Sequence, residues 1–281
     1  MLREKAFSKF ALGAMNNLPC MFLRSFIGRL LDSLTLLDHV TAKRDLLLHI
    51  EPTRIEAKTG EYNSMFAVLA ALSPDESRVA AAQAIVRELS AKNVKVIVIS
   101  RVDVNYDGAA VVYLWTSISR DYFAFKAIWK SYLSNVRKGQ PVLFLNDSII
   151  WQQGAILALV NSVEDSNEVV IPTESLQVER HAQPYFFFVP SVATDQQIRT
   201  LLEPAREWRW KRTAVHHGEF VFLKNLIKSR LNFRFLVSHH EMHLITDTTC
   251  KRIWLLGCQY NPTKLLRQEL AKRFGFTKVT S

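Results

Sequence analysis

The chain has 281 residues, of which 48% are hydrophobic and 22% are charged, a composition that excludes an intrinsically disordered chain and allows a sizeable core. It contains no run of about 18 apolar residues, which argues against a transmembrane helix. Its 36 Lys and Arg against 26 Asp and Glu give a formal net charge of +10, which favours polyanionic partners such as nucleic acid, anionic lipid or phosphate-bearing substrates.

Residues 1–43 are expected to form a basic amphipathic helical segment. Arg24 and Arg29 lie between apolar residues that recur at helical spacing, and this pattern leaves three interpretations open. The helix packs on the rest of the protein, lies on a membrane surface, or belongs to a cleaved targeting peptide. Asn16, Asn17 and Pro19 interrupt the stretch and weaken the last of these. The apolar positions are Phe22, Leu23, Phe26, Ile27, Leu30, Leu31 and Leu34.

Residues 44–281 are expected to form one α/β domain. The alternation of strands and helices predicts a mostly parallel sheet with crossover helices on its faces. The predicted strands are 45–50, 94–100, 109–115, 142–145, 168–171, 185–189 and 233–237. The predicted helices are 64–72, 74–92, 123–136, 155–162, 195–203, 219–230 and 262–274.

The stretch Val142–Trp151, VLFLNDSIIW, places an acid directly after a predicted buried strand. A buried carboxylate is costly unless it is paired, hydrogen-bonded or bound to a metal, and ligands of open α/β sheets bind beyond the carboxyl ends of strands. Asp147 is therefore either a cap of the following turn or, with Asn146, part of a site for a nucleotide-sugar. Such a carboxylate holds the ligand directly or through a divalent cation.

Three further constellations combine polar residues with predicted element ends. Asp121 opens a predicted helix and is either its cap or a contact to a phosphate or sugar at the helix N-terminus. His181 and Gln183 precede a strand of three phenylalanines and either line a pocket or lie in an exposed loop. Glu219 follows His217 at the start of a helix and is either a general base or an acid that complements the helix dipole.

Several common sites are not expected. The cysteines Cys20, Cys250 and Cys258 form no CxxC pair, and their number fits a reducing compartment better than a disulfide framework. The segment HHEMH at 239–243 departs from the HExxH order of zinc proteases. The chain also lacks GxxxxGK[ST], GxSxG and GxGxxG, which argues against the common NTPase, hydrolase and dinucleotide-binding folds.

In their order and spacing, the constellations resemble the rhamnan-synthesis family of bacterial polysaccharide glycosyltransferases, over roughly residues 44–280. Asp121–Ala127 is similar to the family's D-[FY]-x-A-[WYF]-K-A motif, Leu145–Ser148 to L-N-D-S, and His181–Phe186 to H-x-Q-S-[YF]-F. Gly218-Glu219 and Asn261-Pro262-Thr263 resemble two later segments. The chain departs from the family at 115–120, where an R-x-N-x-G run is usual, and at Pro184, where a serine is usual.

The resemblance implies a GT-A-like fold and transfer of a sugar, with rhamnose as one candidate, from a nucleotide-sugar to a growing cell-surface polysaccharide or lipopolysaccharide. It implies that Glu219, or alternatively His217, deprotonates the acceptor hydroxyl. A divalent cation, Mg²⁺ or Mn²⁺, would bind at Asp147. The residues assigned to the donor are Asp121, Asn146, Asp147, His181 and Gln183.

A glycan or lipid-linked glycan acceptor would place the protein in the cytoplasm, at the inner face of the cell membrane, where its basic N-terminal segment meets anionic lipid. Two other functions stay open. One is a basic nucleic-acid-binding protein, which the WRWKR run at 208–212 favours and the scatter of basic residues along the chain disfavours. The other is a catalytically inactive glycosyltransferase-like scaffold, which the departures from the family pattern allow.

Overall fold

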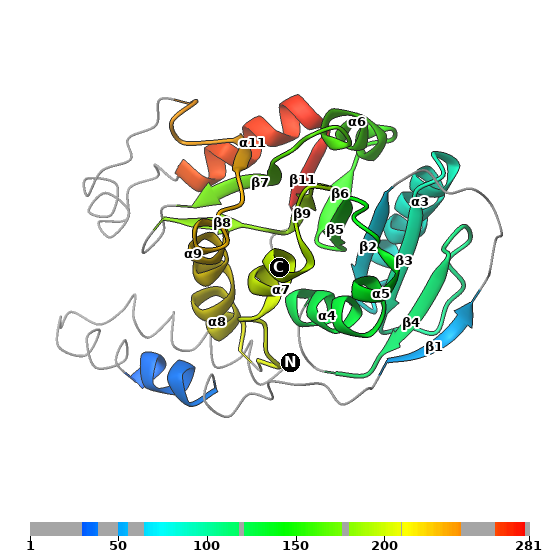
Figure 1. Ribbon diagram of the computed structural model, residues 1–281, viewed down its shortest axis with the longest axis horizontal. Coiled ribbons are helices and arrows are strands. Elements are labelled where there is room, and N and C mark those ends of the chain that lie inside the picture. The colour runs from blue at the N-terminus through cyan, green and yellow to red at the C-terminus, as the bar shows by residue number, and fades with distance from the viewer. Residues whose placement is uncertain are drawn as a thin grey trace.

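The computed structural model describes residues 30–38, 50–55, 65–117, 121–175, 180–208, 210–242 and 262–278. A nine-stranded sheet runs through this part of the chain in the order β1-β4-β3-β2-β5-β9-β7-β10, and β8 pairs with β7 (Figure 1). The strands are β1 (Ile50–Ile55), β2 (Phe66–Ala71), β3 (Lys95–Ser100), β4 (Val111–Trp115), β5 (Val142–Asn146), β7 (Val169–Ser175), β8 (His181–Gln183), β9 (Phe186–Val189) and β10 (Phe233–Val237). A separate ribbon pairs β6 (Ile149–Trp151) with β11 (Phe276–Lys278).

Most strands of the large sheet point in one direction. β2 is parallel to both β3 and β5, β4 is parallel to β3, and β10 is parallel to β7. β9 runs antiparallel between β5 and β7, while β1 and β8 are antiparallel additions to β4 and β7. The expectation of a mostly parallel α/β sheet flanked by helices is confirmed, and the arrangement is compatible with a GT-A-like fold.

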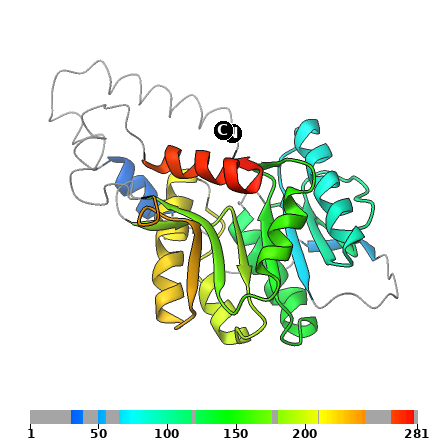
Figure 2. The ribbon, with the colours of Figure 1, turned by 90° about the horizontal axis from the view of Figure 1, so that it is seen from above.

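Helices cover both faces of the sheet (Figure 2). On one face, α3 (Glu76–Ala91), α6 (Ala155–Val163) and α11 (Pro262–Phe274) pack against the sheet. On the other lie α4 (Asp121–Ile128), α7 (Asp195–Leu202) and α9 (Phe220–Lys228). The π-helix η1 (Trp129–Leu133) and α5 (Ser134–Val136) continue α4, and α8 (Lys211–Ala214) with the π-helix η2 (Val215–Glu219) leads into α9.

The prediction of a helix at 64–72 is wrong, because this segment forms the central strand β2. Phe66, Val68 and Ala70 face the α4 side, whereas Ala67 and Leu69 face the α3 side, and all are buried. A strand with helices on both faces has no polar side, so its sequence is a continuous apolar run that periodicity cannot distinguish from a short buried helix.

The first strand also differs from its prediction. Residues 45–49 lie outside the described residues, and β1 begins at Ile50 and contains Pro52. β1 lies at the edge of the sheet, where a proline costs no ladder hydrogen bond to a second neighbour. Its pairing with β4 shifts register between Pro52 and Arg54. The other predicted strands and helices are confirmed, with ends that move by a few residues.

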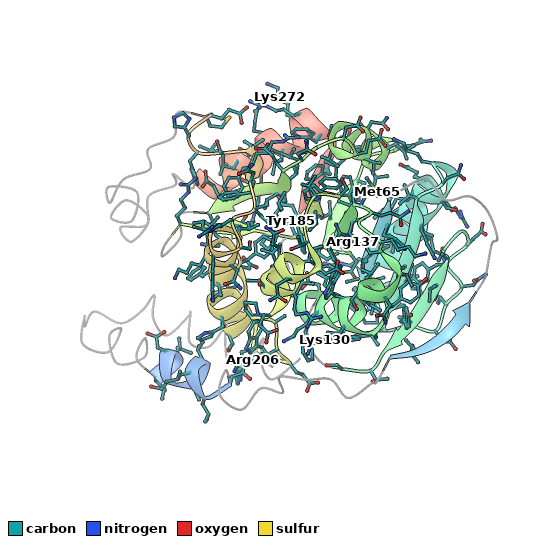
Figure 3. All side chains as sticks on the ribbon, in the orientation of Figure 1. Met65, Lys130, Arg137, Tyr185, Arg206 and Lys272 are labelled. Carbon is teal, nitrogen blue, oxygen red and sulfur yellow. The ribbon has the colours of Figure 1, made fainter. Side chains whose placement is uncertain are left out.

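The buried Arg137 side chain holds the segment that follows β9 through hydrogen bonds to its backbone. The Arg137 guanidinium, which is 1% exposed, donates to the carbonyl oxygens of Pro190 at 3.0 Å and Ala193 at 2.9 Å. It also lies 3.2 Å from the Asp195 carboxylate at the start of α7. Figure 3 shows Arg137 in the interior of the molecule, near α5. Its charge is thus compensated by backbone oxygens and one carboxylate, which explains how the fold tolerates it.

Of the predicted N-terminal amphipathic segment, the structure describes the helix 30–38, and residues 1–29 lie outside the described residues. This helix buries Thr35 and Asp38, and the Asp38 carboxylate accepts a hydrogen bond from the Trp210 backbone at 3.2 Å. Leu30, Leu36 and Leu37 remain 46%, 58% and 60% exposed. None of the helices in the described part of the chain is long and apolar enough to span a membrane.

Candidate active site

Polar residues gather beyond the carboxyl ends of the four parallel strands β2, β3, β4 and β5. Ser73 follows β2, Arg101 follows β3, Ser117 follows β4, and Asp147 follows β5. Arg101 donates to the Ser117 carbonyl oxygen at 3.1 Å, which links two of these strand ends. Because parallel strands end at a common edge, residues distant in sequence meet there, and this edge is where open α/β sheets bind ligands.

Asp147 lies in the turn between β5 and β6, half-buried among these strand ends. Its carboxylate accepts a hydrogen bond from the Ser73 backbone N–H at 2.5 Å, and its own N–H donates to the Ala70 carbonyl at 3.1 Å. Burial raises the pKa of the Asp147 carboxyl group, the Ser73 N–H opposes the increase, and the negative charge of Asp121 adds to it. The positive charges of Arg78 and Arg101 lower the pKa. Asp147 therefore does not cap a helix, and its charge is only partly compensated.

Asp121 and Asn146 are brought into direct contact. Asp121 is the first residue of α4, and its Oδ2 accepts a hydrogen bond from the Asn146 side-chain amide. The other carboxylate oxygen accepts from the Tyr122 backbone N–H at 3.1 Å. Asn146 Oδ1 in turn accepts from the Ser148 N–H at 3.1 Å. Asp121, Asn146 and Asp147 thus form one group, which we call the acidic cluster.

The lysine of the predicted aspartate motif has a structural role. Lys126 is 5% exposed, and its ammonium group donates to the carbonyl oxygens of Glu203 at 2.9 Å and Ala205 at 3.0 Å. These carbonyls belong to the segment between α7 and α8. Lys126 thereby fixes α4, which begins with Asp121, against the segment that leads to Glu219.

Glu219 ends the π-helix η2, and His217 lies in the same turn. A π turn inserts one extra residue into a helix and is frequent at functional sites. A Cβ atom at Gly218 would approach the buried Trp208 ring to 3.1 Å, so a larger residue would push this turn away from its support. Glu219 Oε2 lies 4.0 Å from Nε2 of His181, which brings two of the predicted site residues together.

Tyr122 connects the acidic cluster with Glu219, and its role was not predicted from the sequence. Its ring contacts Phe222 of α9 with 5.5 Å between centroids, and its hydroxyl is buried with no hydrogen-bond partner among the described residues. Burial raises the pKa of Tyr122, and the negative charges of Asp121 and Glu219 raise it further. Its place in the aspartate motif, directly after Asp121, was the one available signal.

Three further residues singled out in the sequence lie in the interior. The side-chain oxygen of Gln183 accepts a hydrogen bond from Arg267 of α11 at 3.2 Å. Trp208, the first residue of the basic aromatic run, is 3% exposed, so its ring is not available for stacking on bases. His239 is 1% exposed, and both of its ring nitrogens lack hydrogen-bond partners in the described part of the chain.

The described residues contain no group of three or more His, Cys, Asp or Glu arranged to hold a metal ion. Mg²⁺, however, commonly takes only one or two protein carboxylates and completes its coordination with phosphates and water. Asp147 and Asp121 are close enough for the charge of one to raise the pKa of the other. Their negative charge is only partly compensated, and it therefore fits a divalent cation that arrives with a diphosphate.

No described protein family and no curated protein matches this sequence. Among solved structures, the chain is similar to the crystal structure of 4-diphosphocytidyl-2C-methyl-D-erythritol synthase from Anaerococcus prevotii, with a TM-score of 0.37 and 13% sequence identity. The match covers 66% of this chain and 93% of that one. A likeness at this level does not bear on function.

Proposed function

We propose that the protein is a glycosyltransferase that moves a sugar from a nucleotide-sugar to a growing bacterial cell-surface polysaccharide or lipopolysaccharide. The observation that carries the proposal is the acidic cluster beyond β5, where Asp147 and Asp121 lie close together and Asn146 bonds to Asp121. Two neighbouring carboxylates at the ligand-binding edge of the sheet repel each other and lower the stability of the empty site. A divalent cation bound with a diphosphate would neutralise their charge and make the arrangement favourable.

The donor would bind over this edge. Asp147 and Asp121 would hold a divalent cation, Mg²⁺ or Mn²⁺, which stabilises negative charge on the leaving nucleoside diphosphate when bound. Arg78 and Arg101, whose charges already act on Asp147, are placed to add positive charge there. The resemblance to the rhamnan-synthesis family assigns His181 and Gln183 to the sugar pocket, with rhamnose as one candidate sugar. Because their side chains contact Glu219 and Arg267, they would act on the pocket through these neighbours.

Glu219 is proposed as the base. In the transfer, the bond between the anomeric carbon and the diphosphate oxygen breaks, and a bond from the acceptor hydroxyl oxygen to that carbon forms. The hydroxyl proton goes to a base, and the Glu219 side chain, which is 28% exposed and whose charge acts on Tyr122 next to Asp121, is accessible for this role. His217 in the same π turn is the alternative base.

Calorimetry tests the donor site. UDP-, GDP- and dTDP-sugars are titrated into the protein with Mg²⁺ or Mn²⁺, and at least one should bind to the wild type and fail to bind to Asp147→Ala. If no nucleotide-sugar of the panel gives a heat of binding and none is hydrolysed, the proposal is wrong. Binding without any turnover, with acceptor glycans present, would support the inactive-scaffold alternative instead.

We also propose peripheral binding to the inner face of the cell membrane. The support is helix 30–38, in which Leu36 and Leu37 are largely exposed and Asp38 accepts a hydrogen bond from the Trp210 backbone. Flotation with anionic liposomes should be strong for the whole chain and weak for the double variant Leu36→Ser, Leu37→Ser and for a chain without residues 1–37. Equal flotation of all three would exclude this segment as the anchor. A gel shift with DNA and RNA at several salt concentrations tests the nucleic-acid alternative.

A further inference from the structure

His181 is held rigidly in the interior, close to the proposed base. It begins β8 and lies opposite Ser175 of β7 in the antiparallel pairing of these strands. Its imidazole packs on the Phe220 ring at 4.3 Å between centroids, and the residue is 3% exposed. A side chain this buried has little surface for contact with a substrate, so any part it plays passes through its neighbours.

The neighbour of chemical interest is Glu219. The side chain of Glu219 is 28% exposed, whereas that of His181 is 4% exposed, and Nε2 and Oε2 are 4.0 Å apart. His181 is thus held in the interior, whereas the Glu219 carboxylate reaches solvent. Other titratable and charged groups lie nearby: His217 in the same π turn, and Arg180, which precedes His181 and pairs with Glu174. From α4, Tyr122 is close enough for the charges of Glu219 and Asp121 to raise its pKa.

We propose that His181 is a positioning residue that orients the Glu219 carboxylate and keeps it ionised. This inference rests on the proposed role of Glu219 as the base. An imidazolium at ion-pair distance favours the carboxylate form of its partner, and the carboxylate in turn favours the imidazolium. Glu219 is the last residue of the π-helix η2 and His181 the first residue of β8, and the contact between these two elements makes the pairing possible.

The test begins with the protein alone, with no substrate. The pKa of the His181 imidazole is measured by two-dimensional NMR in the wild type, with His181→Asn identifying the resonance. In Glu219→Gln the pKa of His181 should fall by about one or more, because a favourable charge at 4–6 Å is removed. Glu164→Gln is the matched control, since Glu164 pairs with Lys92 on the α3 and α6 side and should leave His181 unchanged. An unchanged pKa of His181 in Glu219→Gln overturns the inference.

The second arm follows turnover of whichever UDP-, GDP- or dTDP-sugar the wild type uses. In His181→Asn and His181→Gln the acidic limb of kcat should move to higher pH by about one unit, with KM nearly unchanged, because the pKa of Glu219 rises without its partner. Glu219→Gln separates the two proposals. If it keeps full activity, the base assignment fails; if it is inactive while both His181 variants keep the wild-type profile, only the positioning role fails.

Discussion

The side-chain amide of Asn146 donates a hydrogen bond to the carboxylate of Asp121, and this contact joins the end of β5 to the first residue of α4. The two residues belong to motifs that are separate in the sequence. Asn146 is 6% exposed, so the amide has exchanged water for this carboxylate and for the Ser148 turn. The contact fixes where Asp121 lies relative to Asp147.

Replacing Asn146 by alanine should therefore affect both stability and donor binding. The variant leaves a partly buried carboxylate without its amide donor, which costs about 1–3 kcal/mol of unfolding free energy. Urea unfolding measures this loss, and Asn135→Ala, at an exposed position of α5, is the control with a change near zero. A loss below about 0.5 kcal/mol would show that the contact is not formed in solution.

Asp147→Asn should stabilise the fold while it abolishes donor binding. The pKa of Asp147 is raised in the folded state, so its stabilising contribution is present below the unfolded value of about 3.9 and is lost as pH rises through the folded value. Above that window, removing the charge raises Tm, by about 2–4 °C for each kcal/mol gained. Differential scanning calorimetry at pH 7 measures the change.

The control for this variant is Asp107→Asn at an exposed turn, where the side chain is 77% exposed. It should change neither Tm nor nucleotide-sugar binding. A decrease of Tm in Asp147→Asn would show that the ionised carboxylate stabilises the fold, which would contradict its raised pKa.

Tyr122→Phe should be neutral or stabilising by up to about 1 kcal/mol, because the hydroxyl it removes is buried without a partner among the described residues. Tyr122→Ala should lose about 3–5 kcal/mol, since it also removes the ring that packs on Phe187 and Phe222. Thermal and urea unfolding compare the two variants. A loss above about 1 kcal/mol in Tyr122→Phe would reveal a hydrogen bond in solution.

Lys126→Met should destabilise the protein by about 1–3 kcal/mol, because the carbonyl oxygens of Glu203 and Ala205 lose their shared donor. Limited proteolysis between α7 and α8 should become faster. Lys272→Met, at an exposed position of α11, is the control and should stay within about 0.5 kcal/mol of the wild type. Equal stability of both variants would refute the fastening role of Lys126.

His239→Leu should reduce the loss of stability at acid pH. Burial lowers the pKa of His239 and the positive charge of Arg180 also lowers it, while the negative charge of Glu174 acts in the opposite direction. A histidine with a lowered folded pKa contributes stability above its unfolded pKa of about 6.5, and this stability is lost as pH falls through the folded value. Tm measured from pH 7.5 to pH 5 should fall less in His239→Leu than in the wild type, and His240→Leu at an exposed site should follow the wild type.

Much of the fold could be predicted from local patterns. α3 and α7 follow from their apolar faces and from the caps Asp75 and Thr194, and the clear β-branched run at Lys95–Ser100 predicts β3. The segment 64–72 could not be assigned, because a strand with helices on both faces carries no periodicity that separates it from a buried helix. The order of the strands could not be predicted, because strand pairing depends on residues distant in the sequence. An example is β9, which lies antiparallel between β5 and β7.

The sequence by itself determined the basic charge, the α/β alternation and an acid at the end of a buried strand, since each is a property of consecutive residues. The tertiary structure decided which distant residues meet: Asp121 with Asn146, Glu219 with His181, and Gln183 with Arg267. The physical reason is that the ends of parallel strands meet at one edge of the sheet whatever their separation along the chain. Contacts between elements such as η2 and β8 likewise depend on how the whole chain packs.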